Sequence, residues 1–169
     1  LFRSDWTQEP AHRIAEAVQS GQVSARLVAE QHLTAIAHRN DLLKAYTDVT
    51  AERALARADA IDAARAQRQP LPPLAGVPFA VKNLFDVNGL VTRAGSKINR
   101  DHAPARQDAT LVARMEAAGA VLLGALNMGE YAYDFTGRNA HDGNSRNPHD
   151  TARMTGGSSG GSGGAAAAG

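Results

Sequence analysis

Two stretches of the chain carry residues that could do chemistry, and the first is centred on Lys82. This lysine interrupts the apolar run Val77 to Phe85 (VPFAVKNLF). A lysine in a strand can simply hold its ammonium group in water at the edge of a sheet. In a low-dielectric site, desolvation instead lowers the pKa of the amine and makes a neutral base available. The residues alone leave both interpretations open.

The second stretch, Thr155 to Gly164 (TGGSSGGSGG), is rich in glycine and serine. Such runs are often flexible linkers. Here an Asn147-Pro148 turn precedes the run, and the helix-forming alanines Ala165 to Ala168 follow it. Glycines before a helix let the backbone approach a ligand closely. The free N–H groups at the helix start favour an anion, including an oxyanion formed during catalysis.

A phosphate-binding loop is the obvious rival interpretation of the glycine-rich run. Such a loop needs a lysine followed by Ser or Thr after its second glycine, and no lysine follows Lys97. The alternative is a Ser–Lys arrangement of Lys82 with Ser158 or Ser159, a known variant of the catalytic triad. That arrangement requires the fold to bring together residues far apart in the sequence, which spacing alone does not establish.

Other polar residues give weaker signals. The six histidines are scattered, without the spacing of a metal site. His141 and His149 lie in the expected loop Gly137 to Asp150, and loops often carry functional residues. Asp86 and Glu130 lie near the ends of expected strands, but neither has a visible partner for paired-carboxylate chemistry. The sequence therefore indicates no metal and no cofactor.

The elements that must position these residues fall into two parts, and the first, residues 1–70, is expected to be helical. Gly21 is predicted to end the first helix, and Ser24 is predicted to cap the second. Tyr46 to Thr50 favours a short extended piece because its residues are aromatic and β-branched. Ala51 to Gln67 is expected to form a third, more exposed helix.

Residues 71–169 are expected to form an α/β domain. The apolar runs Val77 to Phe85 and Ala120 to Leu126 predict buried strands. Between them, Asp108 is predicted to cap a helix that ends at Gly119. Strand, helix and strand at this spacing predict a βαβ unit and hence an α/β layered fold.

Composition and charge narrow the function classes. The chain has 169 residues, of which 43% are hydrophobic, and this is enough for one domain with a real core. A net charge of +1 argues against a dedicated nucleic-acid binder. The absence of cysteine excludes disulfides and thiol catalysis, and no apolar run is long enough to span a membrane. We therefore expect a cytoplasmic protein. The first residue, Leu1, and the end at Gly169 within an alanine run suggest a segment of something longer.

Three blocks of the chain, taken in order, carry a specific resemblance. They are LAGVPFAVKNLFDVNGLVTRAGS, DATLVARMEAAGAVLLGALNM and RNPHDTARMTGGSSGGSGGAAAAG. In combination they resemble the amidase signature family, whose members include the A subunit of glutamyl-tRNA(Gln) amidotransferase and many small-amide hydrolases. The resemblance covers Leu74 to Gly169. It implies the N-terminal portion of that fold, a mixed β-sheet core covered by helices, here preceded by the helical lead-in.

The resemblance also implies a mechanism with residue roles. The family hydrolyses amides with a Ser–cisSer–Lys triad, whose lysine matches Lys82 and whose bridging serine matches Ser158. Neutral Lys82 would take a proton from Ser158, which would take one from the nucleophilic serine. Water would then hydrolyse the acyl-enzyme, with release of ammonia. Ser159 and Ser162 would hold the glycine loop through side-chain to backbone hydrogen bonds. Ser159 would also contribute to substrate binding, and Tyr133 would line the substrate pocket.

Finer features indicate a substrate class. The features that look most like a branch acting on carboxybiuret-type ureido compounds are GSKINR from Gly95 to Arg100, the pair Ala132-Tyr133, and NPHDT from Asn147 to Thr151. The resemblance also implies a homo- or hetero-oligomer with a small helical partner subunit, and no direct contact with nucleic acid or membrane.

The chain departs from the family pattern in two ways. The nucleophile belongs to a later DTxGSIR-like block, and the chain stops at Gly169 before that block. In addition, Gly129, Arg138 and Asn144-Ser145 stand where an Asp, a Glu and a Pro-Thr pair are expected. Two other functions therefore stay open: the A subunit of a glutamyl-tRNA amidotransferase, and a catalytically incomplete fragment.

Overall fold

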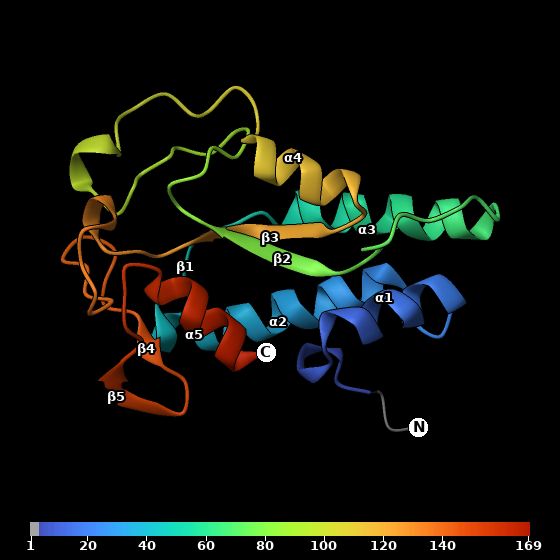
Figure 1. Cartoon of the computed structure of the whole chain (residues 1–169), viewed down its shortest axis with the longest axis horizontal. Helices are drawn as coiled ribbons and strands as arrows, with labels where there is room; N and C mark the ends of the chain where they lie inside the picture. Colours follow the sequence, from blue (N-terminus) through green and yellow to red (C-terminus); the bar gives the residue numbers. More distant parts are fainter. Residues whose placement is uncertain (1–3) are drawn as a thin grey trace.

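The computed structural model describes residues 4–169, and a three-stranded sheet lies at its centre (Figure 1). Its strands, in the spatial order β1-β3-β2, are β1 (Tyr46–Val49), β2 (Pro78–Lys82) and β3 (Val121–Leu126). β2 runs parallel to β3, with Lys82 opposite Leu126, whereas β1 is antiparallel to β3. All of β3 is buried, as expected for a strand that is covered on both faces.

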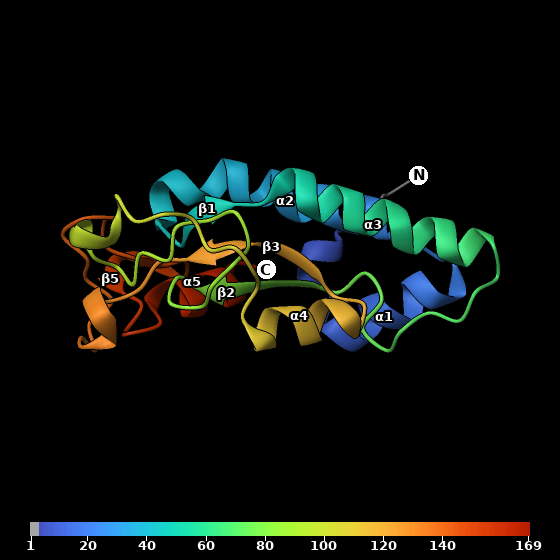
Figure 2. The same ribbon diagram turned by 90° about the horizontal axis from the view of Figure 1, so that it is seen from above.

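Helices cover both faces of this sheet. The α-helices are α1 (Ala11–Ser20), α2 (Ala25–Leu43), α3 (Ala51–Ala66), α4 (Thr110–Ala117) and α5 (Gly160–Ala168). The short 3-10 helices are η1 (Trp6–Gln8), η2 (Lys97–Asn99) and η3 (Glu130–Ala132). In Figure 1, α4 lies above the sheet and α1, α2 and α5 lie below it, and Figure 2 shows α2 and α3 running together. No helix in the described part of the chain is long and apolar enough to cross a bilayer.

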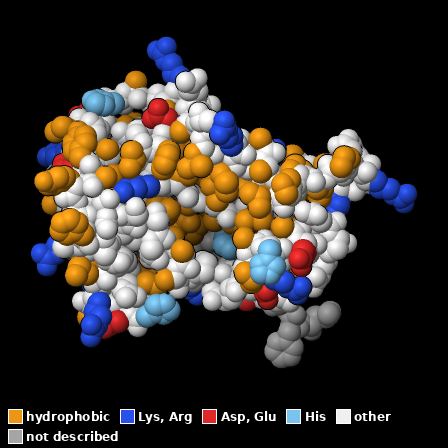
Figure 3. All heavy atoms as spheres, in the orientation of Figure 1, with side chains coloured by type: hydrophobic (Ala, Val, Ile, Leu, Met, Phe, Trp, Pro, Cys, Tyr) orange, Lys and Arg blue, Asp and Glu red, His pale blue; other side chains and the backbone are white. Residues whose placement is uncertain are grey.

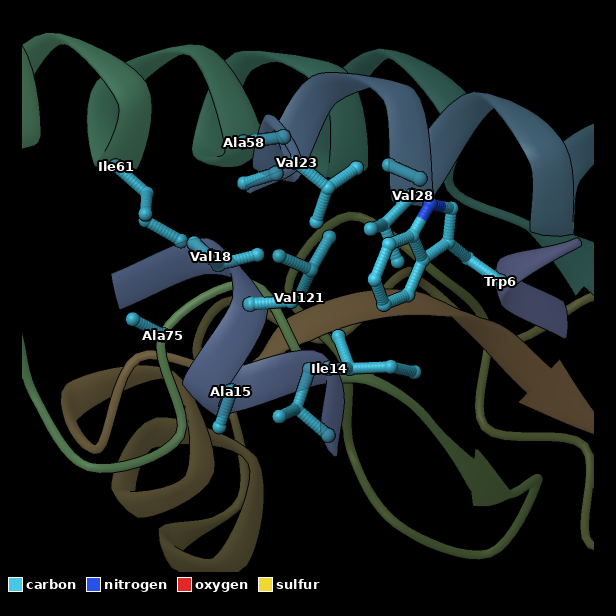
Figure 4. Packing of buried hydrophobic residues seen from close by; sticks show 14 of the residues in the cluster. Trp6, Ile14, Ala15, Val18, Val23, Val28, Ala58, Ile61, Ala75 and Val121 are labelled. Carbon is cyan, nitrogen blue, oxygen red and sulfur yellow. The ribbon is translucent and has the colours of Figure 1, made fainter. Parts of the chain in front are cut away.

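The larger hydrophobic core lies where α1, α2 and α3 meet the sheet (Figure 4). Val18 and Val28 are fully buried, and Val121 of β3 belongs to the same cluster. The next residue, Leu122, packs with Val112 of α4 in a second cluster, because side chains alternate between the two faces of a strand. The larger cluster joins residues on both sides of residue 70, and the domain division expected there stays a prediction.

The helix ends and the βαβ unit confirm the sequence analysis. Gly21 ends α1 with a φ of 82°, a left-handed conformation that glycine adopts without steric cost. The Ser24 hydroxyl accepts a hydrogen bond from Leu27 N at 3.0 Å, and α2 begins at the next residue. The parallel pairing of β2 with β3 across α4 is the predicted strand, helix and strand arrangement.

The expected cap of α4 is wrong. The N-cap residue is Ala109, and Asp108 lies just outside the helix. The Asp108 carboxylate instead accepts hydrogen bonds from Arg53, the shorter at 2.6 Å, and from Asn88 N at 2.8 Å. Arg53 donates two bonds to this carboxylate, and such bidentate guanidinium–carboxylate pairs are among the strong charge-assisted hydrogen bonds. The Asp108 carboxylate therefore binds Arg53 of α3 and does not cap α4.

Two further expectations fail near the C-terminal end. The stretch expected to be a loop contributes β4 (Arg146–Asn147), which pairs with β5 (Asp150–Met154) in an antiparallel hairpin. The Asn147-Pro148 turn closes this hairpin, with His149 N donating to Asn147 Oδ1 at 3.0 Å. In addition, α5 begins at Gly160 and not at the first alanine. Gly160 and Gly161 are buried, so close backbone packing extends the helix into residues of low intrinsic helix propensity.

An apolar hollow lies on the face of the sheet between α2 and α5. Residues that line it include His32, Tyr46, Phe79, Leu123 and Ala165. Figure 3 shows hydrophobic side chains gathered around this hollow. Strand β2 borders it and, within residues 4–169, pairs only with β3, so β2 is an edge strand of the described sheet.

Candidate active site

Lys82 is the last residue of β2, and its side chain reaches the glycine-rich segment. Its Nζ donates a hydrogen bond to Ser158 Oγ at 2.7 Å. The side chain is partly buried, and this burial lowers the pKa of the amine. Lys82 therefore lies on an edge strand, as one interpretation of the sequence expects, but its amine is bonded to a hydroxyl group.

The segment that carries Ser158 is closely packed by the backbone around it. The Gly157–Ser158 peptide bond is cis, as the family resemblance implies. A Cβ atom at Gly157 would lie 2.6 Å from Asp134 O and 2.7 Å from Gly137 N, closer than real Cβ contacts allow. Gly156 has a φ of 81°, which favours glycine. The segment is therefore a packed part of the fold and not a flexible linker.

Two backbone hydrogen bonds hold this segment against the turn that follows β3. Gly129 N donates to Ser158 O at 2.9 Å, and Gly161 N donates to Asn127 O at 3.0 Å. Because β3 pairs with β2, a single pair of strands carries Lys82 and, through this turn, holds Ser158.

A network of polar side chains surrounds the ends of these two strands, and the sequence analysis did not predict it. Asn83, only 2% exposed, donates to Thr47 Oγ1 at 2.7 Å and to Asp48 Oδ2 at 3.0 Å. Its Oδ1 accepts from Arg93 N at 2.9 Å. The Arg93 guanidinium group donates to Asp48 at 2.6 Å and to Asp142 at 3.1 Å. An amide residue directly after an apolar strand is the one sequence signal that could have indicated this network.

The remaining predicted site residues, Tyr133 and Ser159, are exposed. Tyr133 follows η3, and 94% of its surface is open to solvent. Ser159 occupies the N-cap position of α5, but its side chain makes no capping hydrogen bond to the helix. The expectation that its hydroxyl group holds the loop is wrong, because the backbone bonds of Gly129 and Gly161 do so. The roles of both residues toward a substrate stay predictions.

Among the weaker candidates, Glu130 and His141 lie close together. Glu130 Oε1 accepts a hydrogen bond from Ser96 Oγ at 2.6 Å and lies 3.3 Å from His141 Nε2. The bond from Ser96 lowers the pKa of the Glu130 carboxyl group. Within residues 4–169 no group of three or more His, Cys, Asp or Glu side chains could hold a metal ion.

The pairing of Lys82 with Ser158 is the arrangement that can move a proton. A neutral amine within hydrogen-bond distance of a hydroxyl group can accept its proton as a general base. The hydroxyl oxygen can in turn accept a proton from a third group, so the pair can act as a base and a relay.

Comparison with known proteins assigns the chain to one family. Residues 28–169 match the family described as Amidase, and the chain belongs to this amidase signature family. The chain is 61% identical to AtzE, which forms part of the 1-carboxybiuret hydrolase of Pseudomonas sp. (strain ADP), over 92% of this chain and 34% of that protein. It is 42% identical to the A subunit of the glutamyl-tRNA(Gln) amidotransferase of Salinispora arenicola (strain CNS-205), over 98% of this chain and 33% of that protein.

Solved structures show the same fold. An inhibitor-bound complex, described as revealing the evolutionary origins of an s-triazine catabolic enzyme, matches with a TM-score of 0.93 and 59% identity. That match covers 95% of this chain and 35% of the other. The expected fold class, the N-terminal part of a mixed α/β amidase fold, is therefore confirmed. The chain spans about a third of the length of the relatives it matches.

Proposed function

We propose that the protein is an amide hydrolase that acts on a small ureido compound of the carboxybiuret type and releases ammonia. The observation that carries this proposal is the 2.7 Å hydrogen bond from Lys82 Nζ to Ser158 Oγ. The substrate class is supported by 61% identity to a 1-carboxybiuret hydrolase protein, compared with 42% identity to an amidotransferase. No cofactor is needed for this chemistry.

In this proposal Lys82 is the base and Ser158 is the relay. Neutral Lys82 takes the proton of Ser158 Oγ, and Ser158 takes one from the nucleophilic serine expected in the block after Gly169. The nucleophile bonds to the carbonyl carbon, the C–N bond breaks, and the nitrogen leaves as ammonia after gaining a proton. Water then cleaves the acyl-enzyme, so one amide and one water give one carboxylic acid and one ammonia.

Substrate contacts and partners belong to the same proposal. We assign Ser159 and Tyr133 to substrate binding, since both are exposed. Ser159 lies within the glycine segment, and Tyr133 follows η3, which begins after Gly129, the residue that bonds Ser158 O. We also expect a cytoplasmic enzyme in an oligomer with a small helical partner subunit. The oligomer is supported by a structural neighbour, 58% identical, which is described as a protein complex. The net charge of +1 supports the absence of a direct nucleic-acid contact.

The test replaces each member of the pair in the complete protein. Lys82→Ala and Ser158→Ala should each slow ammonia release from 1-carboxybiuret by about 10²- to 10⁴-fold, the usual contribution of a general base. The double variant should be little slower than the slower single variant, because both changes break the same proton path. Arg68→Ala, which removes an exposed basic side chain just after α3, is the matched control.

The pH dependence of the same reaction gives a second measurement. A neutral Lys82 amine is required, so kcat should rise with pH along an acidic limb. Because burial lowers the pKa of this amine, the midpoint of that limb should lie below about 10.4, the ordinary pKa of lysine. Undiminished ammonia release by Lys82→Ala would overturn the catalytic role. Activity with glutamine and glutamyl-tRNA, and none with 1-carboxybiuret, would support the amidotransferase instead.

A further inference from the structure

We propose that Asn127 is a positioning residue of the candidate active site, because its side chain fixes the turn that holds Ser158 next to Lys82. This inference rests on the proposed function and adds to it a residue that does not take part in proton transfer. Asn127 directly follows β3, and Gly129 ends the turn at the start of η3.

The glycine segment lies directly against this turn. Hydrogen bonds from Gly129 N to Ser158 O and from Gly161 N to Asn127 O attach it at Ser158 itself and three residues later. At Gly161, a Cβ atom would lie 2.6 Å from both the N and the O atoms of Asn127. No side chain separates the two backbones there, so a displacement of the turn moves the segment that carries Ser158.

The side chain of Asn127 determines the shape of the turn. It is only 1% exposed, and its Nδ2 donates to Lys44 O at 2.9 Å and to Gly143 O at 2.8 Å. Its Oδ1 accepts from Met128 N at 2.8 Å. Both amide protons are therefore used, and they tie the turn to the end of α2 and to the loop before β4.

The turn also connects the two members of the catalytic pair. Lys82 is opposite Leu126 in the parallel strands, and Asn127 is the next residue after Leu126. The backbone path from the amine to the hydroxyl group therefore runs through Asn127 and the Gly129 amide to Ser158. A shift of about 1 Å would break the bond between Lys82 and Ser158, and misplacements of that size can cost about 10²-fold in rate.

The first experiment replaces Asn127 in the complete protein. Asn127→Asp keeps the size of the side chain but sets a carboxylate oxygen against carbonyl groups, and Asn127→Ala removes all three bonds. With 1-carboxybiuret, kcat should fall by about 10²-fold, and the acidic limb of its pH profile should move to higher pH as the Lys82 amine gains water. The matched control is Gln31→Ala, which removes side-chain amide bonds to Trp6 N at 2.8 Å and Ser4 O at 3.1 Å, away from the turn.

A second pair of variants tests the turn if replacement of buried Asn127 impairs folding. Gly129 has a φ of −61°, which proline adopts, so Gly129→Pro removes the N–H group that bonds Ser158 O without changing this angle. Gly129→Ala adds the same Cβ atom, 2.9 Å from Asp134 Cβ, but keeps the N–H group. The ratio of kcat between the two variants therefore measures the loss of this hydrogen bond together with the displacement of Ser158 O by the proline ring, and proline should be the slower by at least about 10-fold.

Hydrogen exchange supplies a readout that does not depend on the substrate. Asn127→Asp should speed exchange of the Gly129 and Gly161 amides by more than about 10-fold, because exchange follows local opening, whereas Gln31→Ala should not. Unchanged exchange would overturn the inference even in a protein inactive on 1-carboxybiuret. If the Asn127 variants fold and are active with unchanged kcat and an unchanged acidic limb, the inference is overturned as well. If Asn127→Asp speeds exchange but the wild type is inactive on 1-carboxybiuret, only the proposed function is contradicted.

Discussion

The helical face of the sheet and the polar end of the same sheet are held together by different forces. Between α1, α2 and α3, buried aliphatic side chains such as Val18 and Val28 pack against β3. At the ends of β2 and β3, buried amides such as Asn83 and Asn127 bond to backbone and side-chain groups. Apolar burial is roughly proportional to area and has no direction, whereas hydrogen bonds weaken steeply with angle and distance. We therefore expect stability to depend chiefly on the first region and the geometry of the Lys82–Ser158 pair on the second.

The largest effect is expected from Arg93→Ala at the polar end. This change leaves the Asp48 carboxylate without its guanidinium partner and leaves Asp142, whose side chain is only 7% exposed, with Arg100 alone. Removing one partner of a buried ion pair costs about 3–5 kcal/mol of the free energy of unfolding. Urea denaturation measures this loss. The value of kcat should fall as well, because Asp48 Oδ2 accepts from both the Arg93 guanidinium group and Asn83 Nδ2, and Asn83 directly follows Lys82.

An exposed ion pair provides the control for Arg93. Arg13 and Glu16 lie 3.6 Å apart on the surface of α1, so Arg13→Ala should change the free energy of unfolding by less than about 1 kcal/mol. A loss for Arg93→Ala as small as that for Arg13→Ala would show that the polar end contributes geometry without stability.

A smaller effect, confined to stability, is expected from Ile14→Ala in the apolar core. Ile14 lies on α1 and is 3% exposed. Truncating a buried isoleucine costs about 2–5 kcal/mol, the transfer of its methyl groups plus the cavity left behind. The melting temperature should fall, while kcat of the folded protein and its pH profile should stay the same. A shifted pH profile in this variant would remove the distinction between the two regions.

The smallest effect concerns a titratable side chain inside the helical region. His32 on α2 is buried, and this burial lowers the pKa of its imidazole, partly opposed by its bond with Val28 O and by the Asp5 carboxylate. Below about 6.5, the ordinary histidine value, the unfolded chain binds a proton that the folded chain does not. The free energy of unfolding should therefore decline as the pH falls below that value. His32→Gln should reduce the decline, and exposed His38→Gln on the same helix should not.

The sequence predicts the helical region better than the polar end. Helix periodicity, the caps at Gly21 and Ser24 and the buried strand β3 are local signals, and the structure agrees with each of them. The second strand expected to be buried, β2, is only partly buried, because it lies at the edge of the described sheet. The bonds of Asn127 to Lys44 O and Gly143 O join segments that lie far apart along the chain, and no local pattern encodes them. Asp108 fails for the same reason, because a distant Arg53 competes for its carboxylate.

The candidate pair lies between these two cases. A strand-embedded lysine and a glycine-flanked serine are visible in the sequence, but their meeting at 2.7 Å follows from the pairing of β2 with β3 and from the turn after β3. Spacing alone did not establish that Lys82 and Ser158 meet, and the family resemblance predicted that they form a pair.

The packing of α5 has a consequence for how this sequence can change over generations. Gly160, Gly161 and Gly164 are buried in the helix, and at Gly161 even one methyl group would collide with backbone atoms of Asn127. In most helices, replacing glycine by alanine is favourable by about 1 kcal/mol, so neutral drift should erode such residues. Here Gly163 can be replaced, because a Cβ atom there would meet nothing within 4 Å, whereas Gly161 cannot. The most repetitive stretch of the chain is thus among those least free to vary.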